Sequence, residues 1–279
     1  MKNRNGKLFI IATPIGNLAD ITLRALDTLK IVDLIICEDT RVTSKLLKAY
    51  GIEKKLFVYN DNSGQQERDK IIQNLMQGLN IALVSDAGTP LISDPGYKLI
   101  QDLNRNNIKI ETLPGACSII AALTIAGLPT NSFMFIGFLP HKQKAKEDIF
   151  MGISNIDTTI ICFESANRLL ESIEIAINYF SNREFAVARE ITKIFEEVIR
   201  GKAEEVIKYY QENTDKLRGE VVLLIGPPNG EELNLEEKAK MILKDLLTKM
   251  SVRDAVEIAS SQIKLSRKII YKLALELAK

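Results

Sequence analysis

The sequence predicts an α/β protein with two α/β units and a small helical extension. Three observations support this fold class. Short aliphatic and β-branched runs alternate with helix-like apolar spacing, a segment rich in turn formers separates two series of such runs, and segment 230–279 has a helical pattern throughout.

The first series has the rhythm of βαβ units. Its strand-like runs lie at 8–11, 34–37, 56–59, 81–84 and 108–110. Between them apolar residues repeat at helical spacing, as in 21–29, 71–76 and 99–103. This alternation predicts a largely parallel sheet covered by helices.

Turn formers mark two boundaries. Segment 127–132, Gly-Leu-Pro-Thr-Asn-Ser, ends the first series, so we expect a first domain at 1–128. A second domain at 129–229 should contain strands at 133–138, 158–163, 185–188, 195–199 and 221–225, with helices at 168–180 and 203–211. It ends at the Gly-Pro-Pro-Asn-Gly segment 226–230.

The extension at 230–279 is helical and basic. From Lys238 onward it carries ten Lys or Arg against four acids, and 251–254 has a capping-box pattern that opens a helix. A further helix near Ser266 should direct Arg267, Lys268 and Lys272 outward. Two such helices resemble a helix-turn-helix module that binds nucleic acid, but a solvated basic face on a packing hairpin is equally compatible.

The composition limits which kinds of partner and site the sequence supports. Apolar residues make up 46% and the net charge is +1, so global charge gives no argument for a nucleic-acid partner. The three cysteines are far apart and His141 is the only histidine, so we expect no metal site and a surface position for His141. Since no signal peptide or long apolar run is present, we expect a cytoplasmic protein without membrane spans.

Three loops follow strands of the first series, at 13–17, 85–96 and 113–118. The carboxyl ends of parallel strands meet at one edge of a sheet, where ligands bind, so the loops should converge on one cleft. Each loop alone is an ordinary Gly- or Pro-containing turn, but their joint occurrence defines a pocket. The sequence lacks GxxxxGK[ST] and a GxGxxG after its first strand, which excludes a P-loop NTPase and a standard dinucleotide site.

These loops belong to a larger set of motifs. They are Ala-Thr-Pro-Ile-Gly-Asn-Leu at 12–18, Glu-Asp-Thr-Arg at 38–41, and the segments 84–96, 113–118, 137–140, 163–170 and 188–193. Together they resemble the tetrapyrrole methylase superfamily and, within it, the ribosomal RNA small subunit methyltransferase I branch, over nearly the whole chain. Two positions depart from that pattern: Tyr-Asn-Asp-Asn at 59–62 replaces a His-rich stretch, and Ile191 replaces a Leu.

The resemblance implies two αβα-type domains with S-adenosylmethionine in the cleft between them, and a homodimer. It implies 2'-O-methylation of a cytidine in the decoding region of small-subunit (16S) ribosomal RNA, with the assembled 30S subunit as the expected partner. The cofactor contacts that it implies are Pro14, Ala87, Gly88, Thr89, Ile92, Cys117, Ser118, Glu164 and Ile191.

A ribose hydroxyl is a weak acid, so a nearby carboxylate or amine could accept its proton. The candidates are Asp39, Glu164, Glu190 and Lys193. Ion pairing is the alternative role for two of them, Glu164 with Arg168 and Glu190 with Lys193.

The expected RNA contacts are Arg41, Arg168, Arg189 and Lys193, with Arg267, Lys268 and Lys272 in the extension; surface solubility is the alternative for each. Two competing functions stay open: C-methylation of a tetrapyrrole precursor, and a ribosome-assembly factor that binds RNA without catalysis.

Overall fold

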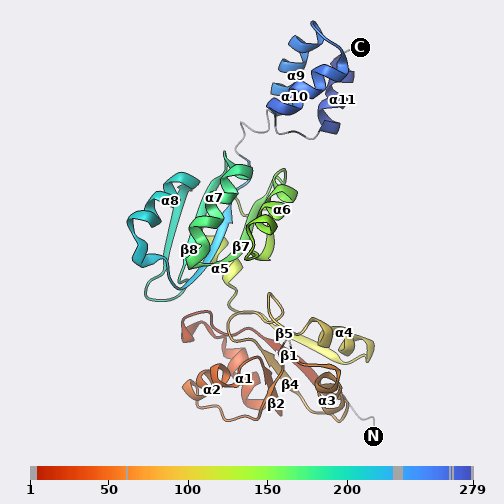
Figure 1. Ribbon diagram of the computed structural model, residues 1–279. Coiled ribbons are helices and arrows are strands. Elements are labelled where there is room, and N and C mark those ends of the chain that lie inside the picture. The colour runs from red at the N-terminus through yellow and green to blue at the C-terminus, as the bar shows by residue number, and fades with distance from the viewer. Residues whose placement is uncertain (1–4, 61, 229–234, 264, 266, 278–279) are drawn as a thin grey trace.

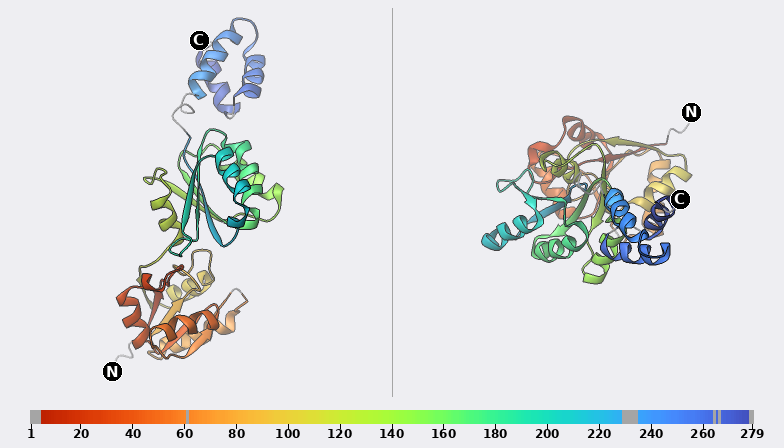
Figure 2. Two further views of the ribbon diagram at one scale, coloured as in Figure 1. Left: turned by 90° about the vertical axis from the view of Figure 1, so that its left-hand side faces the viewer. Right: turned by 90° about the horizontal axis from the view of Figure 1, so that it is seen from above.

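The computed structural model describes residues 5–60, 62–228, 235–263, 265 and 267–277. Three units follow one another along the chain and also in space (Figures 1 and 2). The first two are α/β domains, and the third is a helical unit at the far side of the second domain from the first (Figure 1). The expected α/β fold class is confirmed.

The first domain is built on a parallel sheet with strand order β3-β2-β4-β1-β5. Its strands are β1 (Lys7–Ile11), β2 (Leu34–Cys37), β3 (Leu56–Val58), β4 (Ile81–Val84) and β5 (Lys109–Leu113). The central strands β2 and β4 are buried on both faces. This explains why they are continuous apolar runs rather than alternating ones.

Helices cover both faces of this sheet. Helix α1 (Leu23–Ile31) and helix α2 (Thr40–Ala49) pack on one face, and α3 (Gln65–Met76) and α4 (Tyr97–Arg105) on the other. Local capping fixes where helices begin: the Thr22 side chain accepts a hydrogen bond from Ala25 N, and that of Asp39 accepts one from Arg41 N. The result is a three-layer αβα domain.

The second domain has a mixed sheet of order β6-β7-β10-β8-β9. Its strands are β6 (Phe133–Phe138), β7 (Thr159–Ser165), β8 (Glu184–Arg189), β9 (Glu197–Lys202) and β10 (Glu220–Ile225). Only β6 and β7 pair in parallel, while the other pairs are antiparallel. Helices α6 (Gln143–Ile153), α7 (Leu169–Phe180) and α8 (Ala203–Glu212) cover one face.

The opposite face of the second sheet is covered by α5 (Ser118–Ile125), although this helix follows the last strand of the first domain. Ala122 and Leu123 of α5 pack against Ala186 and Leu224. The expected boundary near residue 128 follows this helix, whereas packing alone groups α5 with the second sheet. The segment between β5 and α5 therefore connects the two sheets.

The extension forms a three-helix unit of α9 (Leu235–Leu247), α10 (Val252–Gln262) and α11 (Arg267–Leu277). Its own core includes Leu243, Val256 and Ile270. Ser251 caps α10 by accepting from Asp254 N, as its sequence predicts. No helix of the described residues is long and apolar enough to cross a bilayer.

The predicted strands are confirmed to within a few residues, with one instructive exception. The run expected at 195–199 forms β9 only from Glu197, and it extends to Lys202. Ile194 and Phe195 precede the strand and are 95% and 63% exposed. Ile194 and Phe195 are therefore apolar residues of a surface loop and do not belong to the strand.

Candidate functional site

A cavity of about 570 Å³ lies between the facing edges of the two sheets. The first domain contributes the loops after β1 and β4. The segment after β5 reaches the cavity at the start of α5. The second domain contributes the ends of β6 and β7, the β8–β9 turn and the start of β10. All of these are strand ends at one edge of their sheet, where side chains and free backbone groups can meet a ligand.

Hydrogen bonds join the three loops of the first domain into one wall. Thr13 N donates to Gly88 O at 2.9 Å, and Gly88 N donates back to Thr13 O at 3.0 Å. Thr89 Oγ1 donates to Ala116 O at 3.0 Å. The expected convergence of the loops on one cleft is confirmed.

Unusual backbone conformations gather at this cavity. Among the described residues, five residues other than glycine have positive φ, and four of them flank cavity residues. Leu91 (φ 76°) and Ser93 (φ 64°) lie on either side of Ile92, and Glu190 (φ 50°) and Thr192 (φ 65°) lie on either side of Ile191. Such conformations persist only where the surrounding structure holds them, and they concentrate at ligand sites. Ile92 and Ile191 thus line the cavity from two backbone segments of unusual conformation.

The start of α5 faces the cavity. Cys117 is the N-cap residue without a side-chain capping hydrogen bond, and Ser118 and Ile119 form the first turn; all three line the cavity. The first amides of a helix have no partner within the helix and carry the positive end of its dipole. This corner therefore suits a carboxylate or another anion.

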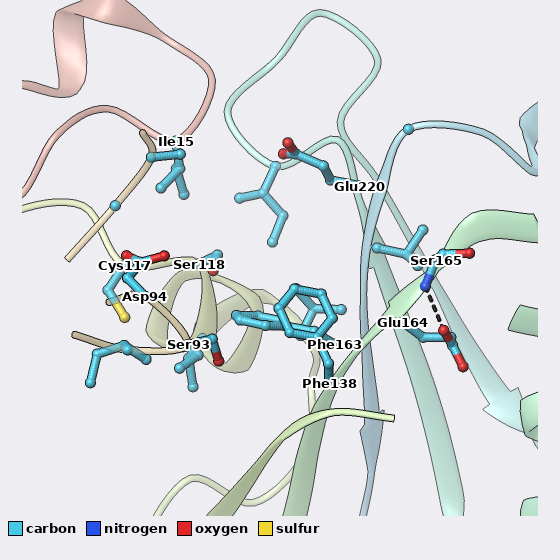
Figure 3. A pocket seen from close by; sticks show the side chains of 18 of the residues that line it. Ile15, Ser93, Asp94, Cys117, Ser118, Phe138, Phe163, Glu164, Ser165 and Glu220 are labelled. Atoms are coloured by element: carbon cyan, nitrogen blue, oxygen red, sulfur yellow. Dashed lines mark hydrogen bonds between the residues drawn. The ribbon is translucent and has the colours of Figure 1, made fainter. Parts of the chain in front are cut away.

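Glu164 is enclosed by donors. Its side chain is fully buried and accepts four hydrogen bonds: from Ser165 N at 2.7 Å, from Arg168 Nε at 2.9 Å and Nη2 at 2.5 Å, and from Ser172 Oγ at 2.6 Å. The bond from Ser165 N is drawn in Figure 3. Glu164 thus forms the ion pair that was its alternative role, and it fixes Arg168 at the cavity wall.

Glu190 and Lys193 form the second expected ion pair, with Lys193 Nζ 2.8 Å from Glu190 Oε1 and 3.1 Å from Glu220 Oε2. Burial opposes ionisation of Glu190, but the Lys193 ammonium and the backbone N–H of Glu220 outweigh it and lower the pKa of Glu190. Burial also opposes the charge on Lys193, and the two carboxylates outweigh it and raise its pKa. Of the three side chains only Glu220 lines the cavity.

Asp39 lies in a separate hollow of about 500 Å³ beside the cavity, with Asp86 on its wall. Arg41 Nη2 lies 2.6 Å from Asp39 Oδ2, and hydrogen bonds from Arg41 lower the pKa of Asp39 to about 2. Burial raises the pKa of Asp86. Because Asp86 directly precedes the cavity residue Ala87, one loop forms the wall between the two spaces.

The expected RNA contacts differ in accessibility. The Arg41 side chain is 86% exposed and that of Arg267 is 67% exposed. Arg189 is buried, and its Nε faces Glu197 Oε2 at 3.7 Å, so an RNA contact would require this side chain to leave an ion pair. Lys272 lies on the surface of α11, and the side chain of Lys268 is outside the described residues.

Eight of the nine expected cofactor contacts line the cavity. They are Ala87, Gly88, Thr89, Ile92, Cys117, Ser118, Glu164 and Ile191. Pro14 is not among the lining residues, and the neighbouring Ile15 takes that position. No group of His, Cys, Asp and Glu suited to a metal ion occurs among the described residues.

Several cavity residues were not predicted. Phe138, Phe163, Glu220 and His141 all line it. His141 is exposed, as expected from the sequence, and it also lines the cavity. Phe138 lies in the Gly-Phe-Leu-Pro motif at 137–140 and His141 follows it, while Phe163 begins the motif segment at 163–170; these two motifs were the sequence signals for this corner. Glu220 had no such signal, because it reaches the cavity through strand pairing.

The fold and the cavity define a two-domain protein of the tetrapyrrole methylase class. The family model for Tetrapyrrole (Corrin/Porphyrin) Methylases matches residues 7–207, and that for the RsmI C-terminal HTH domain matches residues 234–278. A solved cobalt precorrin-4 methyltransferase superposes with a TM-score of 0.57 at 18% identity, covering 79% of this chain and 94% of that one. A uroporphyrin-III C-methyltransferase from Thermus thermophilus, solved with S-adenosylhomocysteine, gives a TM-score of 0.54 at 16% identity, covering 79% and 97%.

Sequence relatives narrow this class. Ribosomal RNA small subunit methyltransferase I of Rickettsia prowazekii is 45% identical over 271 residues, covering 95% of each chain. The protein of the same name from Escherichia coli O157:H7 is 40% identical over 275 residues, covering 98% of this chain and 96% of its own. The chain belongs to the ribosomal RNA small subunit methyltransferase I family of the tetrapyrrole methylases.

Proposed function

We propose that this protein transfers the methyl group of S-adenosylmethionine to a ribose 2'-hydroxyl of a cytidine in small-subunit ribosomal RNA. Membership of a family whose curated relatives carry the name of small-subunit rRNA methyltransferases supports the reaction class. The assignment of this reaction to a site rests on one observation: both domains direct strand-end loops into the same cavity.

The cavity fits the cofactor in size and chemistry. Its volume of about 570 Å³ lies within the roughly 300–1,000 Å³ common for small-molecule sites. The uncapped start of α5 at Ser118 suits the methionine carboxylate, and Ile15, Ile92 and Ile191 offer apolar contacts for the nucleoside. A Cβ at Gly88 would come within 3.1 Å of Ile15 Cγ2, so a larger residue there would crowd this wall. The bound cofactor supplies an electrophilic methyl group on a sulfonium.

The chain's own residues favour a mechanism of positioning. Asp39 and Glu190 have lowered pKa values and are weak bases, whereas Lys193, with its raised pKa, remains an ammonium. Glu164 already accepts four hydrogen bonds. Holding the hydroxyl in line with the methyl group therefore contributes most of the acceleration, and a solvent water accepts the hydroxyl proton as the new C–O bond forms and the bond from the methyl carbon to sulfur breaks.

The cations around the cavity fit a polyanionic substrate. We place the RNA backbone against Arg41, Arg168 and Lys193, with a further contact from the helical extension through Arg267 and Lys272. We also propose that the active form is a cytoplasmic homodimer and that the substrate particle is the 30S subunit.

The test is a methyl-transfer assay with tritiated S-adenosylmethionine on four acceptors. These are free rRNA and assembled 30S subunits, each from cells that lack this protein, a tetrapyrrole precursor, and 30S subunits already methylated by it. Label in RNA of the second acceptor but not of the fourth, mapped to one ribose, supports the proposal. Label only in the precursor, or cofactor binding without transfer to any acceptor, would overturn it and favour one of the two competing functions.

A further inference from the structure

The corner of the cavity formed by β6 and β7 carries an exposed aromatic ring. We propose that Phe138 is the stacking platform for the base of the acceptor nucleotide, which enters the cavity unpaired while Arg168 holds its phosphate. This inference rests on the proposed function and assigns the substrate nucleotide to a particular part of the site.

A β-bulge directs Phe138 to the cavity. Phe135 is opposite Ile161 on β7, whereas Phe138 is opposite Phe163, so three residue steps on β6 match two on β7. Gly137 within this bulge has φ 75°, a conformation that side chains rarely adopt. In a regular strand Phe138 would point to the face opposite Phe135, because successive residues alternate. The bulge returns it to the same face, and bulges commonly re-aim a side chain next to an active site.

One side of the Phe138 ring packs against a second aromatic ring, and the other side is exposed. Its centroid lies 5.0 Å from that of Phe163, and Phe163 also packs edge-on against Phe135 at 4.9 Å. Phe138 is nevertheless 63% exposed and lines the cavity together with Phe163, and Figure 3 labels the two side chains next to each other. A ring that is already ordered loses little entropy when a base stacks on it.

Polar groups around the ring fit the remainder of a nucleotide. Arg168 lines the same cavity, contacts His141 Nδ1 through Nη1, and is held from behind by Glu164. His141 follows Phe138 by only three residues, so the guanidinium lies at the same corner as the ring. Proteins recognise unpaired RNA by stacking bases on aromatic rings and meeting phosphates with arginine.

The position of the corner separates it from the proposed cofactor contacts. Most of those contacts lie on the first-domain loops and at the start of α5, whereas Phe138 is the last residue of β6, and His141 and Arg168 follow β6 and β7 of the second domain. A base that stacks on Phe138 would lie in the same cavity as the proposed cofactor contacts. Enzymes that modify bases likewise take the target nucleotide out of its helix and stack its base on aromatic side chains.

The experiment compares Phe138→Ala, Phe138→Leu and Phe138→Tyr in the full chain, with Phe133→Ala as the matched control. Phe133 is an exposed phenylalanine of the same strand that does not line the cavity. Methyl transfer to 30S subunits is measured at saturating S-adenosylmethionine, and calorimetry measures the affinity for S-adenosylhomocysteine. Loss of one stacking contact should lower kcat/KM for the RNA substrate roughly 5- to 150-fold in Phe138→Ala.

We expect Phe138→Leu to resemble Phe138→Ala, because it keeps the apolar volume but not the ring, and Phe138→Tyr to remain near wild type. Phe133→Ala should also remain near wild type. The inference is overturned if Phe138→Ala methylates as well as wild type, if its S-adenosylhomocysteine affinity falls in parallel with activity, or if its sedimentation shows a changed oligomeric state. Absence of rRNA methylation by wild type would instead refute the proposed function.

Discussion

Replacing Glu164 with Gln should destabilise the second domain strongly, because this carboxylate neutralises two cations from a buried position. Lys146 is fully buried and its Nζ has no hydrogen-bond partner among the described residues. Its ion pairs are with Glu164 Oε2 at 3.7 Å and Glu171 Oε1 at 3.5 Å. In Glu164→Gln the one ion-pair partner left to this ammonium among the described residues would be Glu171, whose side chain is 51% exposed.

The expected loss of stability depends on whether one or both partners of a buried ion pair are removed. Removing one partner leaves an uncompensated charge and costs about 3–5 kcal/mol, whereas removing both charges can be nearly neutral. We therefore expect about 3–5 kcal/mol of destabilisation for Glu164→Gln. Lys146→Met should cost no more than about 1 kcal/mol, since Glu164 keeps the hydrogen bonds from Arg168, Ser165 and Ser172.

The assay must resolve one domain, because a chain of several units does not unfold in a single two-state step. The sequence has no tryptophan, so tryptophan fluorescence cannot report on the unfolding of one domain. Native-state hydrogen exchange of the slowest amides in β10, the central strand of the second sheet, measures the opening free energy of this domain directly. The corresponding amides of β4 in the first domain serve as the internal control.

A double-mutant cycle tests the reasoning further. The cost of Glu164→Gln should fall by about 1–3 kcal/mol in the Lys146→Met background, because the stranded cation is then absent. A Glu164→Gln cost below about 1 kcal/mol, or a cost that is unchanged in the Lys146→Met background, would refute the account of a buried ion pair.

Three other perturbations have expected outcomes. A Cβ at Gly16 would lie 2.6 Å from Lys193 Cγ, so Gly16→Ala should weaken S-adenosylhomocysteine binding at least several-fold by calorimetry, while Gly152→Ala, which meets nothing within 4 Å, should not. The lowered pKa of Glu190 means that its stabilisation of the 190–193 turn is complete above the unfolded value of about 4.3 and is lost as the pH falls through the lower folded value. Hydrogen exchange of that turn, corrected for intrinsic rates, should show this loss in wild type and a pH-independent profile in Glu190→Gln. RNA affinity falls with salt, and Arg41→Ala should reduce the slope of log affinity against log salt concentration by roughly 0.7–0.9. Cofactor affinity should stay unchanged. An unaltered slope would show that Arg41 does not contact the RNA.

The strands and the cavity loops could be predicted from sequence because both depend on local chemistry. Buried parallel strands such as Ile81–Val84 are continuous apolar runs between turn formers, and such runs are readily recognised. The loops then follow from the rule that parallel strands end at one edge. This rule predicts that Gly88 and Ser118 lie in one cleft, and both line the cavity.

The remaining features depend on tertiary contacts. Nothing in the sequence of α5 indicates that it packs on the second sheet, because an apolar helix can cover either sheet equally well. The pairing of Glu164 with Arg168 was foreseen from their spacing of four, but the burial of Lys146 behind it was not, since lysine is normally exposed. The orientation of Phe138 depends on a bulge, which a regular alternation of residues cannot reveal.

The two domains therefore contribute different chemistry to one cavity. The first domain and the start of α5 offer loops that hydrogen bonds join to one another, and these suit a small ligand of fixed shape. The second domain offers an aromatic ring and an arginine, which suit a flexible polyanion. Gly16 and the 191–193 turn bring the two sets into contact, since a Cβ at Gly16 would come within 2.9 Å of Ile191 O. If acceptor choice resides in the second domain, relatives with the same fold can change substrate at the ends of β6 and β7 while the first-domain loops stay as they are.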